Sequence, residues 1–240
     1  MKRNIKSIIQ LLGLDEFRQY YQLKRQIIKR VRSENDEKFK KIKLYENYHK
    51  EVVFVHIPKA AGMSVVDTLY NVKKSCHATS SDYLFKNDLL FNQLFIFTIV
   101  RNPYDRLHSA YNYLVLGGMN VIDKVWFDLY ISKYENFEDF IVNGGLQYAI
   151  NCGAEHFIPQ HEFVYYQGLN LCDYVGRLET LSEVENKLSD KLDRTISFSK
   201  KNVSSTKINS EESNIYSREM LDKVNLLYMK DFELFNYEKK

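Results

Sequence analysis

The sequence predicts an α/β fold in which a central, mainly parallel sheet is flanked by helices in three layers, with a helical arm at the N-terminus. Two apolar segments rich in β-branched residues, 52–57 (VVFVHI) and 94–100 (LFIFTIV), are typical of strands buried in a parallel sheet. Each is followed by a short turn and then by apolar residues at helical spacing. The first 50 residues differ from the rest in composition. We therefore expect an arm over residues 1–50 and one domain over residues 51–240.

The composition is that of an ordinary globular protein that can bury a sizeable core. The chain has 240 residues, of which 45% are hydrophobic and only three are proline. Its three cysteines are odd in number and lack the spacing of metal ligands, so we expect reduced thiols and no metal. No apolar run is long enough to span a bilayer, and Ile8–Leu14 is short for a signal peptide. These features favour a cytoplasmic location.

The positive charge of the chain is concentrated in the arm. Residues 1–50 carry 14 basic and 6 acidic side chains, a net charge of +8, whereas the whole chain has +3. The domain is therefore acidic, with a net charge of −5, and we expect no nucleic-acid partner. Residues 4–32 repeat apolar side chains close to the helical period. They fit a helix packed on the domain; alternatively, they fit a helix that binds the inner membrane face or a second copy of the chain.

The loop between the first strand and its helix is a candidate phosphate cradle. It reads PKAAGMS (58–64), and the first amide groups of a helix lack intrahelical partners and can bind an anion. Ala60, Ala61 and Gly62 are small enough for close approach, and Lys59 adds a charge. Lys59 precedes the small residues, whereas a Walker loop ends in GK[ST]. The sequence therefore predicts a P-loop-like phosphate site outside the magnesium NTPase class, with a plain strand-to-helix turn as the alternative.

A second strand–turn–helix unit places an arginine where ligands bind in open α/β sheets. Arg101 directly follows the strand 94–100, and Pro103 fits the first turn of a helix. Leu107, Ala110 and Leu114 continue that helix at apolar spacing. We therefore expect Arg101 at the same edge of the sheet as Lys59.

The remaining elements follow from periodicity and turn residues. The sequence predicts a short helix capped by Ser80 or Ser81, helices over 124–142, 181–192 and 217–230, and a short strand after Cys172. The segment 146–167 lacks a clean period, so we expect a functional loop there, and the hydrophilic segment 197–213 predicts a surface loop or lid.

Taken together, these motifs identify a family resemblance. HIPKAAGMS (56–64) followed by VRNPYDRLHSAY (100–111) resembles the carbohydrate sulfotransferases of the family-2 type, which use the donor 3′-phosphoadenosine 5′-phosphosulfate (PAPS). Supporting matches follow in the same order along residues 50–240: CHATSSD (76–82), HFIPQ (156–160), DYVGRLETL (173–181), NVSS (202–205) and YMKDFELFNY (228–237). The arm lies outside this likeness. In one departure, Ala60 and Met63 stand where the family's loop often has threonines.

The resemblance implies a donor site and a reaction. The activity would be in-line transfer of a sulfuryl group from PAPS to a carbohydrate hydroxyl of a glycan or glycolipid, as in polysaccharide biosynthesis, with no metal. Arg101 and Ser109 would bind the 3′-phosphate, and Lys59 would bind the phosphosulfate and stabilise the leaving phosphate. The donor-binding residues that the resemblance implies are Lys59, Ala60, Ala61, Gly62, Met63, Ser64, Arg101, Ser109, Ser204, Ser205 and Lys207.

A histidine is the natural base for the acceptor hydroxyl because its pKa lies near neutrality. His77 stands between the two phosphate motifs, as the catalytic histidine of this family does, and is our first choice; His156 is the second. His156, Gln160 and His56 are candidate contacts to the acceptor. An exposed loop histidine and a satisfied core histidine are the structural alternatives for His77 and His56.

Two other functions fit the same motifs less well. A nucleoside or sugar kinase would use a phosphate loop, but the GK[ST] ending and a well-placed magnesium carboxylate are missing. A non-catalytic nucleotide-binding protein, anchored by the basic arm, would bind PAPS without turnover.

Overall fold

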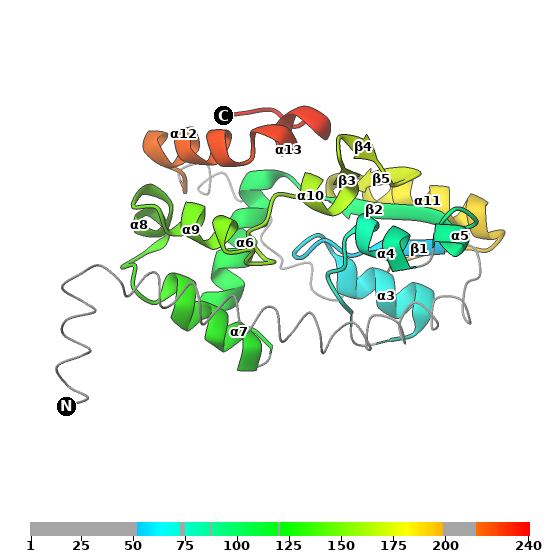
Figure 1. The fold of residues 1–240 in the computed structure, drawn as a ribbon, viewed down its shortest axis with the longest axis horizontal. Helices are drawn as coiled ribbons and strands as arrows, with labels where there is room; N and C mark the ends of the chain where they lie inside the picture. Colours follow the sequence, from blue (N-terminus) through cyan, green and yellow to red (C-terminus); the bar gives the residue numbers. More distant parts are fainter. Residues whose placement is uncertain (1–51, 73–74, 87, 120, 199–214) are drawn as a thin grey trace. The chain divides into compact units, whose positions relative to one another are not determined.

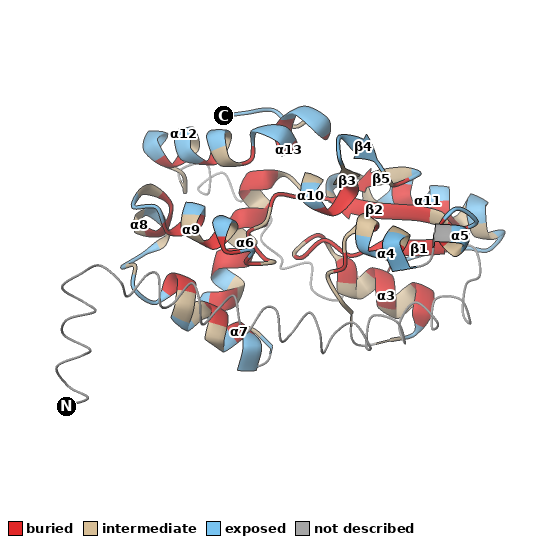
Figure 2. Cartoon of the chain, in the orientation of Figure 1, coloured by how far each residue is buried: buried red, intermediate tan, exposed pale blue. Residues whose placement is uncertain are grey.

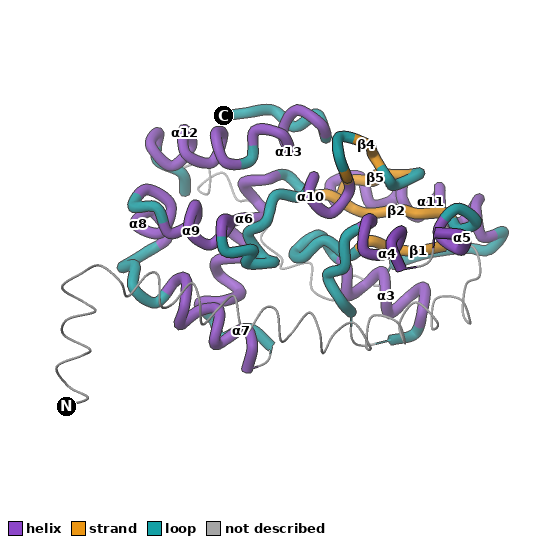
Figure 3. Tube along the Cα trace, in the orientation of Figure 1, coloured by secondary structure: helices purple, strands orange, loops and turns teal. Residues whose placement is uncertain are grey.

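The computed structural model describes residues 52–72, 75–86, 88–119, 121–198 and 215–240, and it confirms the predicted α/β class (Figure 1). A parallel sheet is flanked by helices (Figure 3). The N-terminal arm predicted over 1–50 lies outside the described residues, as does most of the loop predicted over 197–213.

The central sheet contains three strands, β1 (Val52–Val55), β2 (Phe95–Val100) and β5 (Tyr174–Arg177), in the order β1-β2-β5. Both pairs are parallel: Phe54 pairs with Phe97, which pairs with Tyr174. The carboxyl ends of all three strands therefore lie at one edge of the sheet, where ligands bind in open α/β sheets. This edge carries the two motifs that the sequence singled out.

The outer edge of β1 is closed by a side chain from the helix that follows it. Tyr70, at the end of α3 (Gly62–Tyr70), accepts a hydrogen bond from the Phe54 amide at 3.1 Å and donates one to the Val52 carbonyl at 3.2 Å. Unpaired backbone groups of a buried strand are costly, so this hydroxyl stabilises the edge and fixes α3 beside β1. The phosphate-loop candidate between them is thus held at both ends.

Short helices surround the sheet. They are α4 (Ser80–Lys86), α5 (Asp88–Phe91), α6 (Pro103–Val115), α7 (Val121–Trp126), the π-helical turn η1 (Phe127–Ile131), α8 (Phe137–Val142), α9 (Gly145–Asn151), α10 (His161–Val164), the 3₁₀ turn η2 (Leu178–Thr180), α11 (Leu181–Leu192), α12 (Arg218–Leu227) and α13 (Met229–Leu234). A small hairpin pairs β3 (Tyr165–Tyr166) with β4 (Leu169–Asn170).

Three predicted features differ from the structure. The helix predicted over 124–142 is interrupted by η1 and by a turn before α8. The loop predicted over 146–167 contains α9, α10 and the first strand of the hairpin. The short helix after residue 79 is capped by Thr79, whose hydroxyl accepts from the Asp82 amide at 3.1 Å, and not by the predicted Ser80 or Ser81.

The core lies on both sides of β2, which is buried along its length apart from Phe95 (Figure 2). A second group of rings packs α6 against α8 and against the segment after α9. Tyr111 contacts Phe137 and Phe140, and Phe140 contacts Phe157 with ring centroids 5.2 Å apart. This packing holds the chain at 156–160, close to the edge that carries the motifs.

Candidate active site

The loop after β1 has a backbone shape suited to an anion. Lys59 and Ala61 both lie in the left-handed region, with φ of 67° and 61°, which residues other than glycine seldom adopt. Such conformations persist where the surroundings hold them, and they cluster at ligand sites. The Ser64 amide closes the turn by donating to the Ala61 carbonyl at 3.0 Å. Alternating backbone of this kind turns successive amide groups toward one concave side.

Gly62 starts α3 and lies directly against a histidine ring. A Cβ on Gly62 would lie 1.9 Å from the His56 imidazole, which is far too close, so only glycine fits here. The His56 ring is 5% exposed, and its Nδ1 lies 2.8 Å from the Ser75 hydroxyl. The sequence predicted that the small Gly62 lets a ligand come close to the backbone. In the structure the His56 ring lies against Gly62.

The Lys59 ammonium lies in a site with an excess of positive charge. Its nitrogen is 4.0 Å from the centroid of the Tyr113 ring, a cation–π contact. Burial, and then the nearby Arg101, lower the pKa of Lys59 to about 8, while Asp123 acts in the opposite direction. Within the described residues, no carboxylate lies within ion-pair distance of Lys59. The loop therefore presents a cation whose charge an incoming anion would stabilise.

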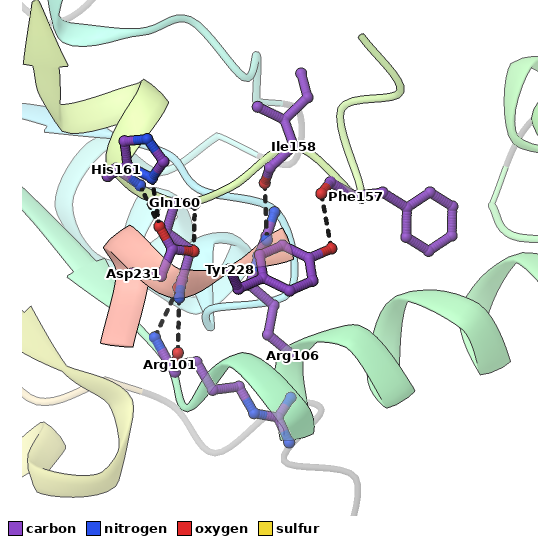
Figure 4. Close-up of polar contacts among 8 residues, drawn as sticks. All are labelled: Arg101, Arg106, Phe157, Ile158, Gln160, His161, Tyr228 and Asp231. Carbon is purple, nitrogen blue, oxygen red and sulfur yellow. Dashed lines mark hydrogen bonds and ion pairs between the residues drawn. The ribbon is translucent and has the colours of Figure 1, made fainter. Parts of the chain in front are cut away.

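The structure brings Arg101 to the same loop. Its guanidinium donates to the Lys59 carbonyl at 3.4 Å. The backbone of Arg101 is held by Gln160, which accepts from the Arg101 amide at 2.9 Å and donates to its carbonyl at 2.8 Å (Figure 4). Gln160 is fully buried, and its amide is engaged at both ends. Gln160 thus supports the backbone of Arg101, and its predicted contact to the acceptor stays a prediction.

Arg106 is a residue of this site that sequence reasoning missed. Its Nη1 donates to the Ile158 carbonyl at 2.9 Å (Figure 4). Its Nε donates to the Pro58 carbonyl at 3.0 Å, so Arg106 ties the phosphate loop to the segment 156–160. It is 1% exposed, and burial lowers its pKa from the ordinary value. In the sequence, Arg106 could have been noticed as the second arginine of the motif RNPYDR (101–106), one helical turn beyond Asn102.

The segment 157–161 is held in turn by the C-terminal helices. Buried Asp231 accepts hydrogen bonds from the Gln160 amide at 2.7 Å and from the His161 amide at 2.9 Å, and it lies 2.8 Å from His161 Nδ1 (Figure 4). Tyr228 donates to the Phe157 carbonyl at 2.8 Å. Tyr228 and Asp231 belong to the motif 228–237, which supports the family resemblance. The sequence assigned no role to either residue.

Three of the predicted histidines form one cluster. His77 lies with its ring centroid 4.7 Å from that of His56 and 5.9 Å from that of His156. Its Nδ1 is 2.5 Å from a carboxylate oxygen of Glu155. The three rings come from separate segments, so the fold assembles them. His77 is one-fifth exposed and has a carboxylate partner, which differs from the solvent-exposed loop histidine of the structural alternative.

His156 is a second buried ring of the cluster, besides His56. It is 7% exposed, stacks on Tyr113 with centroids 5.3 Å apart and meets Trp126 edge-on at 5.5 Å. Burial, and then the neighbouring His77, hold the pKa of His156 well below its ordinary value, so the ring is neutral at pH 7. Its Nδ1 is buried without a hydrogen-bond partner. A neutral acceptor in this position is suited to a ligand hydroxyl or a water molecule.

Tyr113 joins the phosphate loop to the histidine cluster, because its ring contacts both Lys59 and His156. Its hydroxyl donates to Asp123 at 2.7 Å, and burial followed by Asp123 raises the pKa of Tyr113. Asp123 also accepts from the Met119 amide at 2.9 Å. Lys59, Arg101 and the histidines therefore line one continuous region.

The other predicted donor residues vary in their surroundings. Ala60 is buried in the core, and Met63 packs against it half-buried. Ser64 is half-buried in α3, and Ser109 is half-buried in the second turn of α6. Ser204, Ser205 and Lys207 lie outside the described residues.

Searches of the described residues for two other features gave no candidate. No group of three or more histidine, cysteine, aspartate or glutamate side chains there is arranged to hold a metal ion. In the same part of the chain, no helix combines the length and apolar character needed to cross a lipid bilayer.

Comparison with known proteins gives one match. A model of a protein family, described as the Sulfotransferase family, matches residues 42–238. No curated protein and no solved structure matches the chain. The matched range contains both strand–turn–helix motifs, the histidine cluster and the C-terminal helices that support them. The chain therefore belongs to the Sulfotransferase family, of the family-2 type that its motifs resemble.

Proposed function

We propose that the protein transfers the sulfuryl group of PAPS to a hydroxyl of a carbohydrate acceptor, a glycan or glycolipid, with a histidine as base. Membership of the Sulfotransferase family supports sulfuryl transfer. The observation that carries the finer proposal is the convergence of Lys59, Arg101 and the histidine cluster around Tyr113, at the carboxyl edge of the sheet.

The two cationic side chains of the site, Lys59 and Arg101, are suited to a donor that carries two anionic groups. Burial, and then the nearby Arg101, disfavour the charge of Lys59 and lower its pKa. The start of α3 adds backbone donors and the positive end of a helix dipole. Bound PAPS would supply a sulfuryl group attached to a phosphate oxygen, together with the negative charge that the two side chains lack.

In our proposal, specific residues bind each anionic group of the donor. Lys59 and the amides of residues 60–64 hold the 5′-phosphosulfate, and the Lys59 ammonium stabilises charge on the leaving phosphate. Arg101 and Ser109 hold the 3′-phosphate and so fix the geometry for in-line transfer. Ser204, Ser205 and Lys207 complete the nucleotide site, as the family resemblance implies.

The histidines form the acceptor side. His77 serves as the base, because it combines partial exposure with a carboxylate partner. His156 offers its buried Nδ1 to an acceptor hydroxyl as a hydrogen-bond acceptor. His56 packs between Gly62 and His77, and this supports a contact of His56 to the acceptor in our proposal.

Our proposal also covers the cellular location of the protein and the role of residues 1–50. We propose that the protein works in the cytoplasm and that residues 1–50 form a separate basic arm. The arm binds the inner membrane face or a second copy of the chain. Its charge of +8 supports this role.

Thermal denaturation with nucleotides tests the donor. The product analogue 3′-phosphoadenosine 5′-phosphate (PAP) should raise the melting temperature far more than ATP with magnesium, and Arg101→Ala should remove most of this difference. Arg218→Ala is the matched control, since Arg218 is 80% exposed on α12 and pairs only with Asp222 among the described residues. Equal stabilisation by both nucleotides would show that the donor is not PAPS.

A transfer assay tests the reaction. Radiolabelled sulfate from PAPS should reach at least one member of a panel of glycans and glycolipids, and His77→Ala should lower the turnover about 10²-fold or more. PAP binding without transfer to any hydroxyl acceptor would instead identify a non-catalytic binding protein.

A further inference from the structure

The partner of His77 is a glutamate that the sequence motifs did not single out. Glu155 lies 78 residues further along the chain, in the turn between α9 and α10, and its Oε2 is 2.5 Å from His77 Nδ1. Each side chain is 20% exposed, so the pair is partly shielded from water. Building on the function proposed above, we infer that Glu155 is a positioning residue that keeps the proton of His77 on Nδ1 and so leaves Nε2 as the basic nitrogen.

The hydrogen-bonding capacity of the two side chains fixes where the proton of His77 lies. An ionised carboxylate only accepts hydrogen bonds, so the His77 nitrogen facing Glu155 must carry a hydrogen. A neutral imidazole has one N–H and one lone pair, and the lone pair is then on Nε2. Without the carboxylate, both tautomers would be populated, and the ring would lose a contact that fixes its orientation. Glu155 therefore selects the form of His77 that can accept a proton.

The groups around His77 favour this assignment over a base at His156. The ring of His77 faces His56, His156 and Glu155. Positive charge on His156 is disfavoured by burial, by His77 and by two further cations, Lys59 and Arg106. Glu155 also favours charge on His156, but that ring stays neutral because the other effects are larger. A proton arriving in the cluster is best stabilised on the ring that contacts the carboxylate directly.

The proton transfer balances within the proposed reaction. As the bond between the sulfuryl sulfur and the bridging phosphate oxygen breaks, that oxygen keeps the electron pair and leaves as PAP. The acceptor oxygen forms the new bond to sulfur, and its proton moves to Nε2 of His77. The imidazolium that results is paired with Glu155 until it returns the proton to water.

Kinetics of Glu155→Gln test the role. We expect kcat to fall about 10²-fold, with an unchanged KM for PAPS and an unchanged PAP-induced shift in melting temperature, because the donor site does not include Glu155. In a His77→Ala background, Glu155→Gln should cause no further loss. Glu183→Gln, an exposed change on α11, is the control and should leave kcat unchanged. A full additional loss in the His77→Ala background would overturn the inference.

A spectroscopic measurement decides the tautomer without any turnover. Long-range ¹H–¹⁵N correlation spectra of the full chain, recorded above pH ~8 where imidazoles are neutral, distinguish the two nitrogens of each ring. His77 should show the Nδ1–H form in the wild type and in Glu155→Asp, and a shift toward Nε2–H in Glu155→Gln. An Nε2–H form in the wild type would refute the role of Glu155. Absence of sulfuryl transfer with the Nδ1–H form present would refute the proposed function alone.

Discussion

At the scale of single residues, Lys59 shows how the site is prepared for an anion. Its ammonium is largely buried against Tyr113 and is close to a second cation, and both effects disfavour its charge. A lysine with a pKa of about 8 is therefore near its titration point in the unliganded protein. A bound phosphosulfate group would supply the missing negative charge and restore full protonation.

This gives a pH-dependent prediction for donor binding. PAP affinity should be highest below about pH 8 and should weaken as the pH rises through that value, because the free protein then loses the Lys59 charge. Lys59→Arg should flatten this part of the profile, since arginine stays charged. Isothermal titration calorimetry with PAP over about pH 6.5 to 9.5 measures both curves.

Folding stability should change with pH in the opposite direction. The folded pKa of about 8 is below the ordinary lysine pKa of 10.5, so the unfolded chain binds more protons between these values and stability rises with pH across that window. Urea unfolding of the unliganded protein should show this rise, and Lys59→Met should lack it. Identical slopes in the two proteins would mean that Lys59 does not titrate in this way.

The residues that could be predicted from sequence are those whose chemistry is local. Lys59 and Arg101 each follow an apolar strand directly, so the strand pattern fixed their place at one edge. The roles of Gln160 and Arg106 depend on partners 59 and 52 residues away, and no spacing rule announces such contacts. The hydrogen bonds of the Gln160 side chain to the Arg101 backbone could therefore not be predicted from the sequence, and its acceptor contact stays a prediction.

At the scale of elements, the C-terminal helices act as a clamp on the active-site wall. Asp231 on α13 holds the Gln160 and His161 amides, and Tyr228 holds the Phe157 carbonyl. Through Gln160 this clamp reaches Arg101. The helix end is thus connected through Gln160 to Arg101, a donor contact in our proposal, without touching it.

Asp231→Asn should therefore weaken both stability and donor binding. An amide of the same size keeps one acceptor oxygen but turns an NH₂ group toward backbone N–H donors, and leaving buried donors unpaired should cost about 2–4 kcal/mol of unfolding free energy. Urea denaturation gives the stability, and the PAP-induced melting shift gives the binding. Asp222→Asn, an exposed carboxylate on α12, is the matched control and should change stability by under ~0.5 kcal/mol. Equal effects of the two changes would contradict the clamp.

Periodicity predicted the long, amphipathic elements well and the short ones poorly. The helix predicted over 181–192 has the same bounds as α11, and the predicted strand over 94–100 differs from β2 by one residue. The prediction of one helix over 124–142 is wrong because the π-helical turn η1 changes the residue spacing within this segment. The prediction of a loop over 146–167 is wrong because α9 and α10 are seven and four residues long, which is too short to show a helical period of apolar residues. Their ends are set by tertiary packing instead.

At the scale of the whole domain, one polar network connects parts of the chain that are far apart in sequence. Arg106 links Pro58 to Ile158, Gln160 links Arg101 to the same segment, and Asp231 holds Gln160 (Figure 4). Buried hydrogen-bond networks connect the segments that they join, although in this one the Nη2 of Arg106 is buried without a hydrogen-bond partner. A ligand that stabilises the phosphate loop should therefore stabilise the other members as well.

Hydrogen exchange measures this connection. PAP should increase protection in peptides covering 56–64, as expected for direct contact, and also in peptides covering 157–164 and 228–234, which carry no donor-binding residue in our proposal. The Gln160 and His161 amides report directly, since both donate to Asp231. Peptides from α11 should not change, because that helix packs on β5 and lies outside the network. Gln160→Leu removes both bonds to the Arg101 backbone, so it should reduce the protection gained at 228–234 while retaining that at 56–64, since Arg106 still links Pro58 to Ile158. Protection confined to 56–64 in the wild type would show that the network supports the site without transmitting its occupancy.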